Sequence, residues 1–387
     1  MNTHSCVSNT TAAGTSFPTS SPTIRPTTIA VAATIMVTTS LLAAPAIAAG
    51  PNNDIVLVSD FAADVVHRFD GLTGRSLGPL GPGGGLNGPL GIVIGPDQRA
   101  YVASEGSDAV LRYDPISGAF LDAFIPERTG GLTAPAGLLF VPDVTGDGEP
   151  DLLVTSFDTD RILRFDGVHG TFIDELVASG AGGLDGPDAG IDVGPDGRLY
   201  VPSFFGNQIL AYDLATGAFD GVFVPPFPGP VLRPRAISFV QSRAFVVSEG
   251  ADRVYEVDPI HGDLMGIIAE ADGPSAVVIG QSLELLVSSV NDARVSQWDL
   301  AGGGLIGELV PPDAGRLQAP TFVTRLATQA CAADLNRDGT VASDDLLRLL
   351  AAWGPCSDCP ADLNADGMVD AADLSGLLAA WGPCARP

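Results

Sequence analysis

Two stretches near the C-terminus carry oxygen-bearing side chains at the spacing that a hard cation requires. In each stretch Asp, Asn and Asp stand at loop positions one, three and five, glycine stands at position six, and aspartate closes the loop at position twelve. Calcium takes about six to eight oxygen ligands, and this spacing wraps them around one point while the glycine permits a sharp bend. The sequence therefore predicts two Ca²⁺ loops, with ligands Asp334, Asn336, Asp338, the Thr340 carbonyl and Asp345 in the first, and Asp362, Asn364, Asp366, the Met368 carbonyl and Asp373 in the second.

A third acidic loop occurs much earlier in the chain. Residues 143–151 place oxygen side chains at odd-numbered positions, Asp143, Thr145, Asp147 and Asp151, with glycines between them. This pattern suits a hard cation and resembles the short calcium loops of integrin-type repeats. An ordinary acidic β-turn has the same composition, so both interpretations stay open here.

The two C-terminal loops belong to a duplicated unit. Residues 331–356 and 359–384 align over their whole length with an offset of 28 residues, and both end in Leu-Ala-Ala-Trp-Gly-Pro-Cys. Each loop precedes a short apolar segment that Gly-Pro ends, residues 346–353 and 374–381, which predicts one helix after each loop. A paired EF-hand needs a helix on both sides of each loop, and the chain has no room for the additional helices.

The loop–helix duplication resembles the dockerin family. The resemblance implies Ca²⁺-dependent binding to a cohesin-type domain, which would tether the rest of the chain to a scaffold or cell surface. Loop positions ten and eleven usually face the cohesin in that family, and here they are Ser343, Asp344, Ala371 and Ala372. The two pairs differ from each other, so the two-way symmetric binding known in the family is not expected to carry over.

Four cysteines flank the two units, which departs from the usual dockerin. Their even count in an exported segment predicts two disulfides. Pairing within each unit, Cys331–Cys356 and Cys359–Cys384, is favoured because duplication of a self-contained unit copies its internal bond. The alternative joins Cys331 to Cys384 and Cys356 to Cys359. Loop closure does not decide, because the chain-entropy difference between the two closed loops is well under about 1 kcal/mol.

The N-terminal segment has the features of a secretion signal. An apolar run at residues 29–43 precedes the small-residue sequence Ala46-Ile47-Ala48, and the run is too short to form a stable membrane span. We therefore expect residues 1–48 to be a cleaved signal peptide. The protein is then secreted or associated with the cell surface of a bacterium.

Composition and charge favour a turn-rich β protein that binds cations. Glycine (47) and proline (31) are abundant, aromatic residues make up 6% of the chain, and the formal net charge is −27 with 46 acids against 19 basic residues. Such a field repels nucleic acid and anionic membranes. We expect no nucleic-acid partner, and no other stretch of the chain is apolar enough to cross a membrane.

An apolar triplet that ends in a small or acidic residue recurs six times between residues 54 and 326. An aspartate follows each triplet after ten residues, and successive copies lie 41 to 52 residues apart, the length of one four-stranded propeller blade. Five copies have a proline-led strand upstream, and the first copy lacks one. A matching strand occurs at residues 320–325, so we expect it to complete the first blade and to close a ring of six. The triplets end at Asp60, Ser104, Ser156, Ser203, Ser248 and Ser289.

The repeat resembles the NHL-type propellers and the related six-bladed lyases and lactonases. The resemblance is clearest at residues 187–213 and covers about 270 residues. The shared motifs are turns and strand starts, so they indicate the fold and say little about chemistry.

Enzymes of that group place a metal or histidine site at the mouth of the central channel. Here His169 and His261 occupy hairpin turns and His67 belongs to the third strand of its blade, so no histidine is positioned for catalysis. Polar residues that follow second strands can face the opening, namely Asp60, Glu105, Asp158 and Glu249, with Asn207 and Asn291 in register. A metal-dependent site could be assembled from them, but the loops of any acidic propeller contain such residues by chance.

These observations predict a mainly β protein with a signal peptide at 1–48, a six-bladed β-propeller at 52–326, a linker at 327–330 and a small α-helical dockerin-like module at 331–387. We expect a secreted, non-catalytic propeller that binds a ligand or a protein. Its Ca²⁺-dependent module would anchor it to a cohesin-type partner, and the chain would otherwise be monomeric. The alternative is a metal-dependent lactonase, lyase or polysaccharide-active enzyme that its dockerin delivers.

Overall fold

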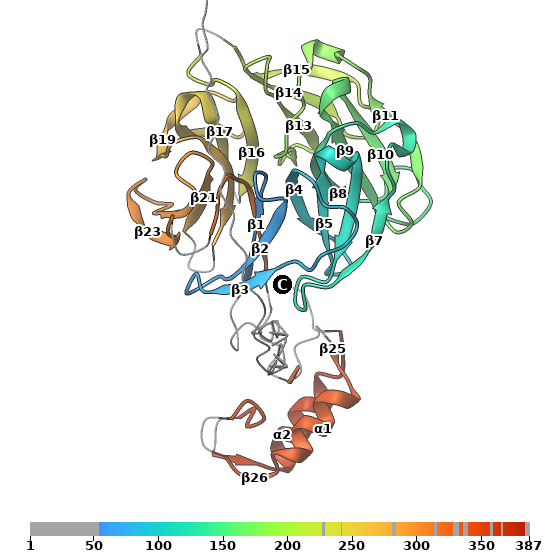
Figure 1. Cartoon of the computed structure of the whole chain (residues 1–387), viewed down its shortest axis with the longest axis vertical. Helices are drawn as coiled ribbons and strands as arrows, with labels where there is room; N and C mark the ends of the chain where they lie inside the picture. Colours follow the sequence, from blue (N-terminus) through green and yellow to red (C-terminus); the bar gives the residue numbers. More distant parts are fainter. Residues whose placement is uncertain are drawn as a thin grey trace, which may run out of the picture. The chain divides into compact units, whose positions relative to one another are not determined.

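The computed structural model describes residues 54–226, 229–240, 242–280, 284–312, 316–327, 333–335, 340–356, 359–364 and 367–383. The predicted signal peptide lies outside these residues. The described chain is mainly β, with six four-stranded antiparallel sheets and two short helices near the C-terminus (Figure 1). Neither of these helices is long and apolar enough to cross a membrane.

Each sheet is one blade of a propeller, numbered here from the N-terminus and described from the innermost strand outward. Blade 1 is β24 (Pro320–Leu326), β1 (Ile55–Asp60), β2 (Val65–Asp70) and β3 (Ser76–Pro79); blade 2 is β4 (Pro89–Ile94), β5 (Ala100–Ser104), β6 (Ala109–Tyr113) and β7 (Phe120–Ile125); blade 3 is β8 (Pro135–Val141), β9 (Asp151–Ser156), β10 (Arg161–Asp166) and β11 (Phe172–Val177). Blade 4 is β12 (Asp192–Val193), β13 (Arg198–Ser203), β14 (Gln208–Asp213) and β15 (Phe219–Val224); blade 5 is β16 (Pro234–Val240), β17 (Arg243–Ser248), β18 (Arg253–Val257) and β19 (Leu264–Glu270); blade 6 is β20 (Pro274–Ile279), β21 (Leu285–Ser289), β22 (Arg294–Trp298) and β23 (Leu305–Val310).

The ring closes in blade 1, where strands from the two ends of the propeller sequence meet. β24 pairs antiparallel with β1, so that Val58 faces Val323 and Ile55 faces Leu326. β24 also contacts the innermost strands β20 and β4 of the neighbouring blades. The prediction that the last strand completes the first blade of a six-bladed ring is confirmed.

The core consists of six apolar clusters, each shared by two adjacent blades. Alternating strand residues and large aromatic side chains fill these interfaces; Tyr101, Phe165 and Tyr212, for example, are almost wholly buried. Burial of one large apolar side chain contributes about 1.5–3 kcal/mol, so the stability of the ring comes mainly from contacts between blades.

A polar turn between the second and third strands links each blade to the next. Its last residue has a left-handed backbone, and the side chain there accepts the N–H of the residue before the proline that opens the next innermost strand. Five junctions have this hydrogen bond: Asp64 with Gly88 (2.8 Å), Asp108 with Ala134 (2.9 Å), Asp160 with Gly186 (2.8 Å), Asn207 with Arg233 (2.8 Å) and Asp252 with Gly273 (3.0 Å).

The C-terminal module consists of two loop–helix units. The described elements are β25 (Thr340–Val341), α1 (Ser343–Ala351), β26 (Gly354–Pro355), β27 (Met368–Val369), α2 (Ala371–Ala379) and β28 (Gly382–Pro383), with β25 paired to β28 and β26 paired to β27. A small core contains Val341, Leu349, Val369 and Leu377, all fully buried. The two units are therefore joined by two short antiparallel strand pairs.

Both helices begin three residues earlier than the sequence predicted. Asp345 accepts the N–H of Ala342, and Asp373 accepts the N–H of Asp370, each at 2.8 Å. These contacts satisfy N–H groups at the start of each helix, which extends the helix back into the loop. The closing aspartate of each predicted calcium loop therefore also caps a helix.

Candidate functional site

In the second predicted calcium loop, the carboxylates of the described residues organise the backbone around them. Asp362 Oδ2 accepts the N–H of Gly367 at 2.8 Å, with Gly367 at a φ of 89°. Asp373 is almost wholly buried, and its Oδ1 accepts the N–H of Leu363 at 2.8 Å. The N–H of Asp370, which Asp373 Oδ2 accepts, is the main influence that lowers the pKa of the Asp373 carboxyl. A carboxylate held ionised inside a loop has the form that calcium requires.

The first loop repeats part of this arrangement. Asp345 is fully buried and caps α1 as Asp373 caps α2, while Asp334 is half-buried. Three predicted ligands, Asn336, Asp338 and Asp366, lie outside the described residues, as does the side chain of Thr340. No three carboxylates, imidazoles or thiolates of the described chain are grouped so that they could hold a metal ion. Calcium binding by these two loops stays a prediction.

The four residues that the dockerin resemblance assigns to partner binding are exposed. Ser343 and Asp344 open α1, and Ala371 and Ala372 open α2. Apolar side chains further along the two units are also exposed, at positions that the duplication relates in two pairs. Leu350 (47%) and Leu378 (52%) belong to the helices, and Trp353 (48%) and Trp381 (50%) follow two residues after the helices end. An exposed apolar surface of this kind marks an interaction site more often than an ordinary helix face does.

The predicted disulfide pairing is wrong. The structure joins Cys356 to Cys359, with their Cα atoms 5.8 Å apart, and each predicted bond used one of these two residues. The physical reason is the turn between the units: β26 ends at Pro355 and pairs with β27, which brings the two cysteines that follow β26 together. Cys331 and Cys384 lie outside the described residues.

In the propeller, charged groups gather where second strands end and innermost strands begin. Arg235 lies 3.1 Å from Asp188 and 3.1 Å from Glu249, and Arg233 lies 3.2 Å from Glu249. Asp188 is fully buried; burial raises the pKa of its carboxyl, and the charge of Arg235 opposes that effect. The ion pairs therefore join β16 of blade 5 to the segment that leads into β12 of blade 4 and to the turn that follows β17.

Two further acids extend this charged cluster to blades 2 and 3. Burial raises the pKa of Glu105, and the nearby carboxylates of Asp158 and Asp188 raise it further, while Arg235 opposes them. Glu105, Asp158 and Glu249, which the repeat places after second strands, belong to this cluster, whereas Asp188 and Arg235 were not predicted. Their position in the repeat could have indicated them, because Asp188 and Arg235 each directly follow the proline of the repeated proline-led motif.

Three phenylalanines lie beside the charged cluster. The rings of Phe157 and Phe205 are 5.6 Å apart and those of Phe204 and Phe205 are 5.1 Å apart, although Phe205 is 58% exposed. The guanidinium of Arg235 lies 5.6 Å from the centre of the Phe204 ring, a cation–π contact. The mouth of the ring thus combines exposed aromatic surface with charges of both signs, which suits the binding of a polar ligand or a protein segment.

Asp60 does not belong to this mouth cluster, contrary to the sequence analysis. Its side chain is fully buried; Oδ2 accepts the N–H of Gln318 at 2.7 Å and Oδ1 that of Ala319 at 2.9 Å. His67 Nε2 lies 3.5 Å from Asp60 Oδ2, whereas His169 and His261 are exposed turn residues. Asp60 and His67 therefore hold the closing strand rather than a ligand.

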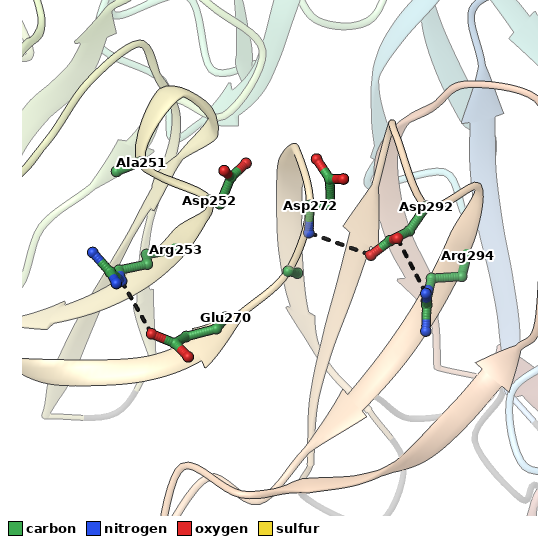
Figure 2. Close-up of a pocket in the computed structure, with 8 residues that line it drawn as sticks. Ala251, Asp252, Arg253, Glu270, Asp272, Asp292 and Arg294 are labelled. Atoms are coloured by element: carbon green, nitrogen blue, oxygen red, sulfur yellow. Dashed lines mark hydrogen bonds and ion pairs between the residues drawn. The ribbon is translucent and has the colours of Figure 1, made fainter.

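The two asparagines also have structural roles. Asn207 links blades 4 and 5 through the hydrogen bond described above, and Asn291 Nδ2 donates to Asp272 Oδ1 at 2.7 Å. Asp272 and its neighbours line a shallow groove between blades 5 and 6 (Figure 2). Ion pairs neutralise much of this groove, between Arg253 and Glu270 (3.2 Å) and between Arg294 and Asp292 (3.1 Å), as Figure 2 shows. Its walls combine turn residues with the ends of β18, β19 and β22, to which Arg253, Glu270 and Arg294 belong.

Comparison with known proteins identifies the fold alone. No protein-family model matches the chain, and no curated protein matches it. Among solved structures, a chain of a nidogen/laminin complex aligns with a TM-score of 0.56 and 18% identity, covering 72% of this chain and 100% of that one. A Bacteroides caccae protein of unknown function aligns with a TM-score of 0.52 and 11% identity, covering 72% and 99%. A streptogramin B lyase aligns with a TM-score of 0.47 and 17% identity, covering 66% and 81%.

The two alignments with TM-scores of 0.56 and 0.52 indicate a shared fold. The chain therefore contains a six-bladed β-propeller, and its similarity to these structures is too low to carry a function across.

Proposed function

We propose that this protein is an exported, non-catalytic propeller that a Ca²⁺-dependent, dockerin-like module anchors to a cohesin-type partner. The observation that carries the proposal is the repeated architecture of the module. In both units a buried aspartate closes the loop and caps the helix, Asp345 in the first and Asp373 in the second. The same duplication leaves Trp353 and Trp381 half-exposed on the module.

Calcium is the cation that fits these loops best. Loop positions one and twelve are carboxylates in both units, and Asp362 and Asp373 already hold backbone N–H groups of their own loop. Bound calcium would add positive charge to this acidic group and would fix the starts of α1 and α2 relative to each other. The exposed residues at those helix starts, Ser343, Asp344, Ala371 and Ala372, would then contact the partner.

The propeller is the part that this module positions. Its mouth offers a phenylalanine cluster next to Arg235, Asp188 and Glu105, and most of these charges are engaged with each other. Such a surface favours recognition of a ligand or protein over catalysis, since the arginine already neutralises two of the acids. The enzyme alternative rests on the remaining acids, Glu105 and Asp158.

The test measures binding of the purified full-length chain to a panel of purified cohesin domains by surface plasmon resonance, with Ca²⁺ and with a chelator. We expect at least one cohesin to bind in Ca²⁺ and to lose more than about tenfold in affinity in chelator. Asp334→Ala combined with Asp362→Ala should abolish binding in Ca²⁺, and Asp158→Ala, an exposed acid of the propeller, should leave it unchanged. Binding that survives in chelator and in the double variant would overturn the proposal.

A further inference from the structure

Blade 3 differs from the other blades in the hairpin between its first two strands. Nine residues separate β8 from β9, whereas five separate β4 from β5 and two separate β16 from β17. The longer connection contains the acidic loop at residues 143–151, and the sequence left open whether this loop binds an ion.

The burial of Asp151 distinguishes this loop from an ordinary acidic turn. The residue is 1% exposed, and its Oδ1 is buried without a hydrogen-bond partner. Its other oxygen, Oδ2, accepts the N–H of Val144 at 3.2 Å, so the carboxylate is directed into the loop. An unpaired, buried carboxylate oxygen is costly, and a bound cation is one of the few groups that can offset the cost.

The hydrogen bonds of this loop match those of the second C-terminal loop. Asp143 Oδ2 accepts the N–H of Gly148, five residues later, at 2.8 Å, as Asp362 Oδ2 accepts that of Gly367 at 2.8 Å. In both loops the closing aspartate accepts the N–H of the residue after the first one: Val144 donates to Asp151, and Leu363 donates to Asp373. Two unrelated segments of the chain therefore fold their first and last carboxylates around the backbone in the same way.

We propose that residues 143–151 form a Ca²⁺ site in the propeller, with Asp143, Thr145, Asp147 and Asp151 as side-chain ligands. Oxygen ligands of mixed type on a flexible loop favour calcium over magnesium, which demands a stricter octahedron. The carboxylates of the described chain do not converge as they stand, so binding would turn Asp143 and Asp147 toward the free oxygen of Asp151.

The ion would stabilise the propeller rather than change its mouth. Asp151 opens β9 and pairs across the sheet with Val141 and Asp166, while the mouth residues Phe157 and Asp158 follow the opposite end of β9. A cation at Asp151 would therefore fasten the β8–β9 hairpin to β10. This site is independent of the docking module.

Equilibrium dialysis of the full chain against Ca²⁺ tests the site. A background variant, Asp334→Ala with Asp362→Ala, disables the two C-terminal loops. We expect three ions per chain in the wild type, one in the background, and none when Asp151→Asn is added to the background. Asp158→Asn, a matched change at the other end of β9, should keep the single ion.

Thermal unfolding of the same proteins gives a second measurement. Ca²⁺ at a hundredfold excess over Kd should raise the Tm of the background variant by about 5 °C or more. Mg²⁺ at the same concentration should raise the Tm by less. If Asp151→Asn fails to fold, Asp147→Asn in the exposed part of the loop replaces it and should also remove the ion.

The stoichiometries separate this proposal from the proposed docking function. No ion bound to the background variant, or one still bound after the Asp151 and Asp147 substitutions, would overturn the propeller site. Two ions in the wild type with none in the background would leave the docking module supported alone. One ion in both would support the propeller site alone.

Discussion

Five of the six blade junctions are held in one way, and the junction where the ring closes is held in another. At the five regular junctions a left-handed Asp or Asn reaches forward to the next blade, as Asp108 does to Ala134. The residue at that position in blade 6 is Ala293, which has no acceptor on its side chain. Asp60 of blade 1 binds the closing segment through the N–H groups of both Gln318 and Ala319. At the same position of four other blades a serine accepts only one such N–H, namely Ser104, Ser156, Ser203 and Ser248.

A ring of repeats needs additional hydrogen bonds where the two ends of its sequence meet. Consecutive blades are neighbours in sequence, and the turn contributes one hydrogen bond to each of their junctions. The closing strand β24 arrives from more than 250 residues away from β1 in sequence, and its entropy of closure is larger. A fully buried carboxylate with two N–H donors and His67 nearby is the stronger connection that this junction uses.

The largest expected effect comes from Asp60. Asp60→Ala leaves two N–H groups of the closing segment without an acceptor in a buried site, and we expect a loss of about 3 kcal/mol in the free energy of unfolding. Urea denaturation of the propeller measures it. His67→Ala should cost less, since His67 only approaches Asp60, and equal losses for the two variants would contradict the assigned roles.

The pH dependence of stability tests the same junction. Burial tends to raise the pKa of Asp60, but His67 and the N–H groups of Ala319 and Gln318 outweigh it and hold the pKa below its ordinary value of 3.8. A carboxyl with a lowered folded-state pKa contributes stability that is complete above the unfolded-state pKa and is lost as the pH falls through the folded one. We expect wild-type stability to fall more steeply than that of Asp60→Asn below about pH 4. Parallel curves from urea titrations at pH 2 to 6 would exclude this contribution.

A regular junction should give a smaller effect. Asp108→Ala removes the acceptor for Ala134 and the ion pair with Arg128, and we expect a loss of about 1–2 kcal/mol by urea denaturation. Asp108→Asn is the matched control, because blade 4 uses Asn207 for the same hydrogen bond, and it should recover most of the loss. A loss as large as that of Asp60→Ala would remove the distinction between the two kinds of junction.

The smallest effect is expected at Ala293, the position that lacks the acceptor. Its φ of 51° strains a residue with a Cβ and provides no hydrogen bond in return. Ala293→Gly should therefore stabilise the propeller by about 0.5–1 kcal/mol, whereas Asp108→Gly should destabilise it. Opposite signs for the same substitution at equivalent positions would confirm the comparison, and a loss at both positions would contradict it.

Much of the fold was predictable because it repeats in the sequence. The aspartate that follows each apolar triplet predicted a tight turn, and at Gly217, with a φ of 67°, a side chain would collide with the carbonyl oxygen of Leu176. The proline-led strand at residue 320 predicted the ring closure that β24 makes with β1. Strand order and blade count follow from such local signals because each blade pairs strands that are consecutive in the chain.

The candidate site was only partly predictable. Glu105 and Glu249 follow the last residue of a second strand and belong to the charged cluster, but Asp60 is itself the last residue of β1 and is buried in the junction. Asp60 is in register with Ser104 and Ser248, whose hydroxyls also accept an N–H of the segment before the innermost strand, so the register of the repeat separates Asp60 from the two glutamates. The Asp188–Arg235 ion pair was missed because its residues are 47 positions apart and belong to different blades.

The repeat, its period, the strand that closes the ring and the duplicated loop–helix units are all visible in the sequence, because each depends on residue types at fixed local spacing. The packing of the elements sets which acids belong to the charged cluster, which hold the junctions, and which cysteines join. The Cys356–Cys359 bond illustrates the reason: the duplication favoured a bond inside each unit, but the pairing of β26 with β27 crosses from one unit to the other. Contacts between segments distant in sequence depend on how the elements pack, and local spacing does not specify that packing.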